Sequence, residues 1–181
     1  MGRRPNLVLL GFMGTGKSAV GRRLAAATGR PLLEMDAEIE RRAGKKIAAI
    51  FAEEGEGAFR EMETALAREW GAEKEGAVIS CGGGAALRPE NLRHLGENGV
   101  LVCLTARPEA ILERTGRSKD RPLLATEDRE QKVRELLASR AEAYGRIANR
   151  VDTSDLTPQE VARRVLALWD GGMRAHGEGA V

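Results

Sequence analysis

Residues 11–18 constrain this chain more than any other segment, because they read Gly-Phe-Met-Gly-Thr-Gly-Lys-Ser and fit the pattern G-x-x-x-x-G-K-[ST] in full. An apolar run at residues 6–12 leads into the segment, and a stretch with helical periodicity at 17–28 leads out of it. Glycines allow successive backbone N–H groups to turn toward one anion, and the N-terminus of the following helix adds partial positive charge. The spacing predicts a phosphate-binding loop. A chance match in an ordinary strand-to-helix turn is the alternative, and the strand and helix on either side disfavour it.

The residue types within the loop indicate a nucleoside triphosphate as the ligand. Lys17 can reach the β- and γ-phosphates, and the Ser18 hydroxyl is a candidate ligand for Mg²⁺. The predicted nucleotide-binding residues of this segment are Gly14, Thr15, Gly16, Lys17, Ser18 and Ala19.

Short apolar runs alternate with segments of helical periodicity along the chain. The apolar runs occupy residues 6–12, 31–35, 77–81, 100–105 and 147–152, and the helical segments occupy 17–28, 37–42, 47–51, 57–70, 89–95, 108–115, 129–144 and 158–169. Nearly continuous apolar runs are typical of strands buried on both faces, so the alternation predicts an α/β fold with a parallel sheet. The 181 residues suit a single domain, expected over residues 1–170, and the polar, glycine-rich segment 171–181 is expected to be a disordered tail.

The composition argues against several classes of function. The 29 basic and 27 acidic residues nearly cancel, so no strong field favours nucleic acid or an anionic membrane. No apolar stretch approaches ~18 residues, the length of a membrane span, and no signal peptide is recognisable, so a cytoplasmic protein is expected. Cys81 and Cys103 cannot form a disulfide framework, and His94 and His176 have no partners at metal-ligand spacing.

The rest of the chain narrows the kind of protein that would use such a loop. A GTPase usually carries Asn-Lys-x-Asp for guanine, and that tetrapeptide is absent from the sequence. A motor-type ATPase usually has an apolar strand that ends in Asp, whereas the runs at 77–81 and 100–105 do not. The mass of 19.5 kDa then favours a small-molecule kinase.

Two carboxylates at the end of the second apolar run point to the acceptor side of the reaction. Glu34 and Asp36 are two residues apart, which places them on one face of a strand, and the carboxyl end of a parallel strand faces the ligand crevice. One could hold Mg²⁺ through water, and the other could accept a proton from a hydroxyl group. Asp36 could equally be the N-cap of the helical segment 37–42, and the two roles can coexist.

Two further segments have alternatives that the sequence leaves open. The glycines at 82–84 would either let a ligand touch the backbone or form a flexible turn. Residues 115–124 are polar and basic, so they form either a mobile lid over the nucleotide or a plain surface loop. Arginine is the dominant cation and suits bidentate recognition of carboxylate or phosphate. Arg60, Arg121 and Arg140 are candidates, although periodicity does not separate them from arginines on exposed helix faces.

Taken together, these segments resemble the shikimate kinase family. The stretches that carry the resemblance are GFMGTGKSAVGRRLA (11–25), MDAEIERRAGKKIAAIFAEEGEGAFREMET (35–64), ISCGGGA (79–85), ERTGRSKDRPLL (113–124) and SRAEAYGRIANRVDTS (139–154). They follow the order and spacing of the family over residues 6–169. The combination of D-x-E-I-E, I-F-x-x-x-G-E-x-x-F-R-x-x-E and R-P-L-L is highly specific, whereas the phosphate loop alone is not.

The resemblance implies a fold and a reaction. The fold would be a three-layer P-loop kinase of the nucleoside-monophosphate-kinase type, with a five-stranded parallel sheet in the order 2-3-1-4-5, a substrate-binding segment at about 36–64 and a lid at about 115–124. The reaction would transfer the γ-phosphate of ATP to the 3-hydroxyl of shikimate, with Mg²⁺, in a cytoplasmic monomer. A related kinase such as gluconate kinase, or a non-catalytic nucleotide-binding module, is the alternative.

The resemblance also assigns roles to single residues. Asp36 matches the aspartate that contacts the substrate hydroxyls and is the candidate base. Arg60, Gly83 and Arg140 match the contacts to the shikimate carboxylate, and Arg121 matches the lid arginine that reaches the ATP phosphates. The remaining assignments are Lys17 in catalysis, Phe51 and Phe59 in the substrate pocket, and Arg114 and Pro158 beside adenine.

One departure from the family concerns the metal. Shikimate kinases commonly have Asp-x-Asp at the end of the second strand, whereas this chain has Glu34-Met35-Asp36. Water-mediated binding should tolerate the longer side chain, because Mg²⁺ usually keeps several waters. Ser18 is therefore the predicted metal ligand, and Glu34 is not assigned as a direct one.

The implied strand order makes a statement about the two cysteines. The first strand would separate the strands of Cys81 and Cys103 by about two strand spacings, ~9.5 Å. A disulfide needs its two Cα atoms within about 7 Å. Free thiols are therefore predicted.

Overall fold

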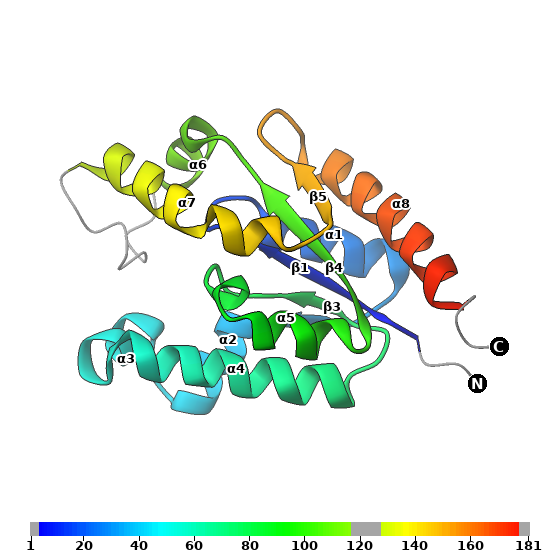
Figure 1. The fold of residues 1–181 in the computed structure, drawn as a ribbon, viewed down its shortest axis with the longest axis horizontal. Helices are drawn as coiled ribbons and strands as arrows, with labels where there is room; N and C mark the ends of the chain where they lie inside the picture. Colours follow the sequence, from blue (N-terminus) through cyan, green and yellow to red (C-terminus); the bar gives the residue numbers. More distant parts are fainter. Residues whose placement is uncertain (1–3, 117–127, 178–181) are drawn as a thin grey trace.

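A single parallel sheet lies at the centre of the protein, and within the described residues, 4–116 and 128–177 of the computed structural model, it has five strands (Figure 1). The strands are β1 (Asn6–Gly11), β2 (Leu32–Glu34), β3 (Val78–Ser80), β4 (Gly99–Thr105) and β5 (Asn149–Asp152). They lie in the order β2-β3-β1-β4-β5, which confirms the order that the family resemblance implied. The first strand is therefore central, with Leu7 opposite both Val78 and Val100.

Helices connect the strands, since parallel neighbours need a crossover connection. They are α1 (Lys17–Thr28), α2 (Met35–Ala43), α3 (Ile47–Glu53), α4 (Gly55–Glu73), α5 (Pro89–Gly96), α6 (Pro108–Thr115), α7 (Arg129–Gly145) and α8 (Pro158–Gly177), with a short 3₁₀ helix η1 (Ala85–Leu87). Proline begins α5 and α6, where its missing N–H costs no helical hydrogen bond. None of the helices that the structure describes is long and apolar enough to cross a membrane.

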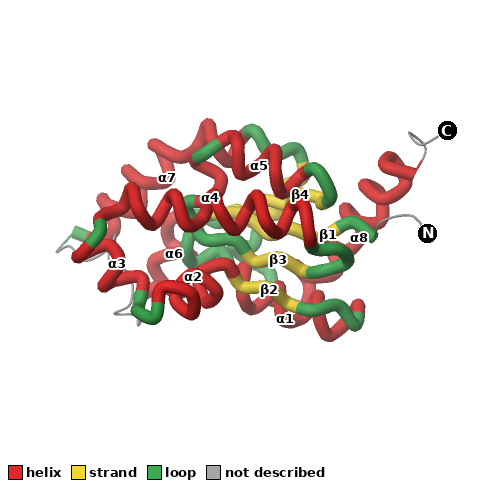
Figure 2. The backbone as a smooth tube through the Cα atoms, turned by 90° about the horizontal axis from the view of Figure 1, so that it is seen from below, coloured by secondary structure: helices red, strands yellow, loops and turns green. Residues whose placement is uncertain are grey.

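Alternate side chains of the central strand divide the core into two halves. Leu7 and Leu9 belong to the cluster beneath α1 and α8, whereas Val8 and Leu10 belong to the cluster beneath α4, α5 and α7. All four are fully buried, as the continuous apolar run at 6–12 predicts for a strand covered on both faces. The result is a three-layer arrangement of helices, sheet and helices (Figures 1 and 2).

Two boundaries differ from the sequence-based expectation. The second strand ends at Glu34 and α2 begins at once with Met35, so Asp36 lies in the first turn of the helix rather than on the strand or at the N-cap. The last helix, α8, continues to Gly177, beyond residue 170, where the sequence analysis ended the domain. A helix that already exists gains a hydrogen bond for each residue added, and this offsets the low propensity of glycine. Residues 178–181 lie outside the described residues.

The carboxyl ends of the strands meet at one edge of the sheet, and the phosphate loop, α2 and the glycines at 82–84 follow them there. Figure 2 shows α2 and α3 beyond this edge, on the side away from the chain termini. In an open α/β sheet, this edge is where ligands bind.

Candidate active site

Glycines with left-handed backbone conformations shape the loop after β1. Gly11, Gly14 and Gly16 have φ angles of +132°, +78° and +94°, a region that other residues rarely adopt. A Cβ on Gly11 would also collide with the carbonyl oxygen of Leu104 in β4. The loop therefore needs glycine for its conformation and for its close approach to the neighbouring strand.

The first turn of α1 carries the charged and hydroxyl groups of the loop. The Nζ atom of Lys17 donates to the carbonyl oxygens of Gly11 at 2.8 Å and Phe12 at 2.9 Å, so the ammonium group lies over the loop. Ser18 is exposed beside it. The N-cap residue is Gly16, which provides no side-chain cap, so the helix N-terminus is open to an anion.

A cleft of about 870 Å³ lies beside the loop, and most of the predicted site residues line it. Those residues are Gly14, Gly16, Lys17, Ser18, Ala19, Asp36, Phe51, Phe59, Arg60, Gly83, Arg114 and Arg140. Thr15 does not line the cleft, because its side chain is buried and its hydroxyl donates to the carbonyl of Phe12 at 2.7 Å. Arg121 and the rest of the expected lid from residue 117 onward lie outside the described residues.

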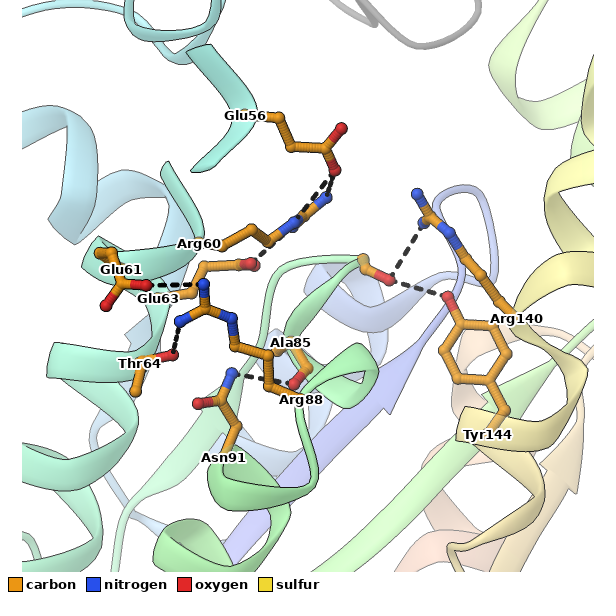
Figure 3. Close-up of polar contacts among 11 residues, drawn as sticks. Glu56, Arg60, Glu61, Glu63, Thr64, Ala85, Arg88, Asn91, Arg140 and Tyr144 are labelled. Carbon is orange, nitrogen blue, oxygen red and sulfur yellow. Dashed lines mark hydrogen bonds and ion pairs between the residues drawn. The ribbon is translucent and has the colours of Figure 1, made fainter. Parts of the chain in front are cut away.

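Arg60 is held in place by two acidic residues of its own helix, α4 (Figure 3). Its Nη1 donates to Glu63 Oε2 at 2.5 Å, and its Nη2 and Nε donate to Glu56 Oε1 at 2.6 Å and 3.1 Å. The guanidinium lies directly against Gly84, where a Cβ would overlap it. Among the described residues, these bonds engage three of the five guanidinium N–H donors, so a ligand can take the others.

Glu63 is a buried carboxylate beneath the cleft. Its side chain is 0% exposed, and burial raises its pKa from the ordinary 4.5 to about 7, with a smaller contribution from Asp36 and with Arg60 and Arg140 opposing the shift. A Cβ on Gly82 would contact both Glu63 Oε1 and Asp36 Oδ1, so the two carboxylates pack against the same glycine. The site therefore contains, beside Asp36, a buried carboxylate whose pKa is raised.

The opposite wall of the cleft is formed by α7. Arg140 is 5% exposed, and its Nη1 lies 3.4 Å from the carbonyl oxygen of Gly83. The hydroxyl of Tyr144 donates to the same oxygen at 2.7 Å. Figure 3 shows Arg60 and Arg140 entering the site from opposite sides, one from α4 and one from α7. The two arginines therefore lie on either side of the glycine segment.

Glu34 and Asp36 both line the cleft, at the carboxyl end of β2. The alternation of a strand does not explain this, because the helix has begun between them at Met35. Met35 is fully buried and anchors the turn in the core.

Arg114 of α6 lies between the phosphate loop and the turn from β5 to α8. Its Nη1 donates to the hydroxyl of Thr153 at 3.0 Å, and its Nη2 donates to the carbonyl of the same residue at 2.6 Å. The hydroxyl of Thr153 lies 3.1 Å from the carbonyl oxygen of Thr15 in the loop. Arg114 therefore braces the loop from the side where the chain passes from β5 into α8.

Sequence reasoning gave no role to Glu56, Glu63 or Tyr144. A signal for the two acids was present, because residues four before and three after Arg60 share its helix face. The contact of Tyr144 with Gly83 joins distant segments, and no local pattern indicates it.

A parallel sheet in this order, with an anion-binding loop after its central strand and arginines facing that loop across a cleft, is the architecture of P-loop kinases that act on small molecules. Comparisons with known proteins are more specific. The family model for shikimate kinase matches residues 13–169. The shikimate kinase of Pelotomaculum thermopropionicum is 47% identical over 161 residues, which cover 89% of this chain and 93% of that protein. The chain belongs to the shikimate kinase family, whose members are ATP-dependent kinases.

Solved structures agree with this. Shikimate kinase from Acinetobacter baumannii in complex with shikimate has a TM-score of 0.86 and 40% identity, over 91% of this chain and 92% of that one. A gluconokinase from Sinorhizobium meliloti has a TM-score of 0.65 but only 20% identity, over 99% of this chain and 100% of that one, and shows a shared fold alone.

Proposed function

We propose that the cleft binds shikimate with its carboxylate between Arg60 and Arg140 and with a hydroxyl directed at Asp36, and that the γ-phosphate of ATP is transferred to the 3-hydroxyl. The observation that carries this proposal is the pair of buried guanidinium groups that contact the Gly83–Gly84 segment. A planar carboxylate suits the donors of a guanidinium fork. The structure of the Acinetobacter baumannii relative, solved with shikimate, supports the choice of substrate.

The catalytic roles follow from position in the cleft. Asp36 would accept the proton that the attacking hydroxyl loses. Lys17 would leave the loop carbonyls for the β- and γ-phosphates and balance charge there. Arg121 is assigned to the phosphates by the family resemblance. Arg114 would border the adenine from the β5–α8 side.

The donor set at the loop fits Mg²⁺. The hydroxyl of Ser18 and the carboxylate of Glu34 both line the cleft and are hard oxygen donors, the kind that Mg²⁺ prefers. Ser18 would hold the ion directly and Glu34 through water. When bound, the ion would neutralise charge on the transferring phosphate.

A cytoplasmic location and a monomeric state are part of the same proposal and rest on the family. Light scattering at working concentration tests the monomer, and a stable dimer would contradict it.

An assay that couples ADP release to a spectroscopic signal tests the proposal. We expect turnover with shikimate and none with gluconate. Asp36→Asn should bind ATP normally but lose at least about a hundredfold in kcat, the usual scale of general base catalysis. Asp170→Asn, an exposed change on α8, is the control. Turnover on gluconate alone, or ATP binding without turnover on any substrate, would reject the assignment, and near-normal turnover of Asp36→Asn would reject the base.

A further inference from the structure

We propose that Tyr144 is a positioning residue of the carboxylate site, which acts by fixing the peptide between Gly83 and Gly84 and so leaves Arg140 available to the substrate. The inference rests on the proposed function, because it assigns Arg140 to the shikimate carboxylate.

Hydrogen-bond lengths indicate which side chain holds the glycine peptide. The Tyr144 hydroxyl donates to the Gly83 carbonyl at 2.7 Å, an ordinary length for an O–H donor, whereas Arg140 Nη1 is 3.4 Å from the same oxygen. The phenol therefore satisfies the carbonyl, and the guanidinium makes only a weak contact with it. The guanidinium also contacts the Tyr144 hydroxyl, and its remaining N–H groups are left for a carboxylate.

The glycine segment needs such a contact because its turn does not fix the peptide between Gly83 and Gly84. The Gly82 carbonyl accepts from the Ala85 N–H at 3.2 Å, and a turn closed in this way allows two orientations of its central peptide. Residues 82–84 are three consecutive glycines, and each can adopt a wider range of backbone angles than any other residue. Neighbouring groups must therefore select one orientation of the peptide. In a trans peptide, the N–H of Gly84 points opposite to the carbonyl of Gly83. The hydrogen bond that this carbonyl accepts from Tyr144 therefore also directs the N–H away from α7.

Tyr144 is suited to this role by its placement. It lies one helical turn after Arg140 on α7, so the two side chains reach the same peptide from one rigid helix (Figure 3). Its side chain is 7% exposed, and burial raises the pKa of its hydroxyl to about 12. The group therefore stays a protonated donor at any pH at which the enzyme would be assayed.

Tyr144→Phe removes only the hydroxyl and tests the inference by steady-state kinetics. We expect KM for shikimate to rise about three- to tenfold, the scale of one hydrogen bond. The kcat and KM for ATP should stay within about twofold, because the hydroxyl that is removed bonds to Gly83 and not to the nucleotide loop. Ser139→Ala, which removes an exposed hydroxyl bond to the Leu136 carbonyl on the same helix, should change none of the three.

The methyl ester of shikimate separates positioning from a general loss of packing. The ester lacks the charge that Arg140 would bind. With the ester as substrate, the KM of Tyr144→Phe should therefore be about equal to the KM of wild type. An equal ratio for acid and ester would overturn the inference, and so would a change in kcat alone.

Arg140→Lys distinguishes failure of this inference from failure of the proposed function. A raised KM for shikimate in Arg140→Lys together with a normal KM in Tyr144→Phe would overturn the role of Tyr144 alone. A normal KM in Arg140→Lys would overturn the carboxylate assignment itself.

Discussion

Glu63 shows how one buried side chain can link substrate binding to pH. It lies beneath the glycines of the site, it is bonded to Arg60, and Asp36 and Arg140 also act on its pKa. Desolvation outweighs both arginines and raises its pKa to about 7. The ion pair with Arg60 is therefore weaker evidence of stability than its short length suggests, because burial of the charge costs free energy.

The pH dependence of the free energy of unfolding tests the raised pKa of Glu63. The folded protein binds the Glu63 proton more tightly than the unfolded chain does, so this residue lowers the free energy of unfolding as pH rises from 4.5 to about 7. Glu63→Gln cannot lose a proton. We expect wild type to lose stability relative to Glu63→Gln between about pH 4.5 and 7, by a few kcal/mol at most. Urea unfolding across this range measures the difference, and a difference that does not vary with pH would contradict the raised pKa.

The packing of α4 on α5 depends on a glycine in the middle of a helix. A Cβ on Gly71 would collide with the backbone carbonyl of His94 in α5. Gly57 lies on the same helix, but a Cβ there would meet nothing within 4 Å. The two glycines therefore serve different purposes, although both lie in a helix where alanine has the better propensity.

Alanine substitutions at these two positions should change the free energy of unfolding in opposite directions. Gly57→Ala should raise the free energy of unfolding by about 0.5–1 kcal/mol, because it restricts the unfolded chain without a clash. Gly71→Ala should lower it by about 1–3 kcal/mol or more, because α4 and α5 must move apart. Chemical denaturation of both variants measures the signs. A stabilised Gly71→Ala would show that the helices pack less closely than described.

Much of this element structure could be predicted from local signals. The bounds of α1 and α6 agree with the periodicity, and a capping box begins α8, where the Glu160 carboxylate accepts from the N–H of Thr157 at 2.8 Å. The junction of β2 and α2 could not be predicted, because Met35 is apolar whether it ends a strand or anchors a helix. Packing in the folded core determines whether Met35 ends the strand or begins the helix.

The candidate site likewise has one part that the local sequence predicts and another part that only the fold explains. The phosphate loop could be predicted because its residues are consecutive and each has a reason for its type. The resemblance to the family supplied Arg60 and Arg140, and the structure brings them together at the glycine segment. The raised pKa of Glu63 depends on burial, and burial is a property of the fold rather than of any segment.

At the scale of the whole molecule, the two cysteines can report unfolding. Cys81 is 3% exposed and Cys103 is 0% exposed, and both are free thiols, as predicted from the strand order. Burial raises the pKa of Cys103 to about 11 and that of Cys81 further, so neither forms the reactive thiolate in the folded protein.

We expect both thiols to react with a thiol reagent only as fast as the protein opens. At neutral pH the labelling should be at least about a thousandfold slower than for the unfolded chain, and a mass measurement without reductant should show no internal bridge. Both sites should become reactive at the same urea concentration if the sheet unfolds as a unit. Rapid labelling of one cysteine in the native protein would contradict its burial.

The central position of β1 has a consequence for how the chain is made. The first two strands to leave the ribosome, β1 and β2, do not pair with each other, since each pairs with β3, which follows more than forty residues after β2. No strand pair can form until β3 has emerged, and β1 is not enclosed until β4 has followed. Folding that depends on such long-range contacts is slow. The nascent chain must therefore carry an apolar strand without a partner until β3 has emerged, the stage at which a chaperone would protect it.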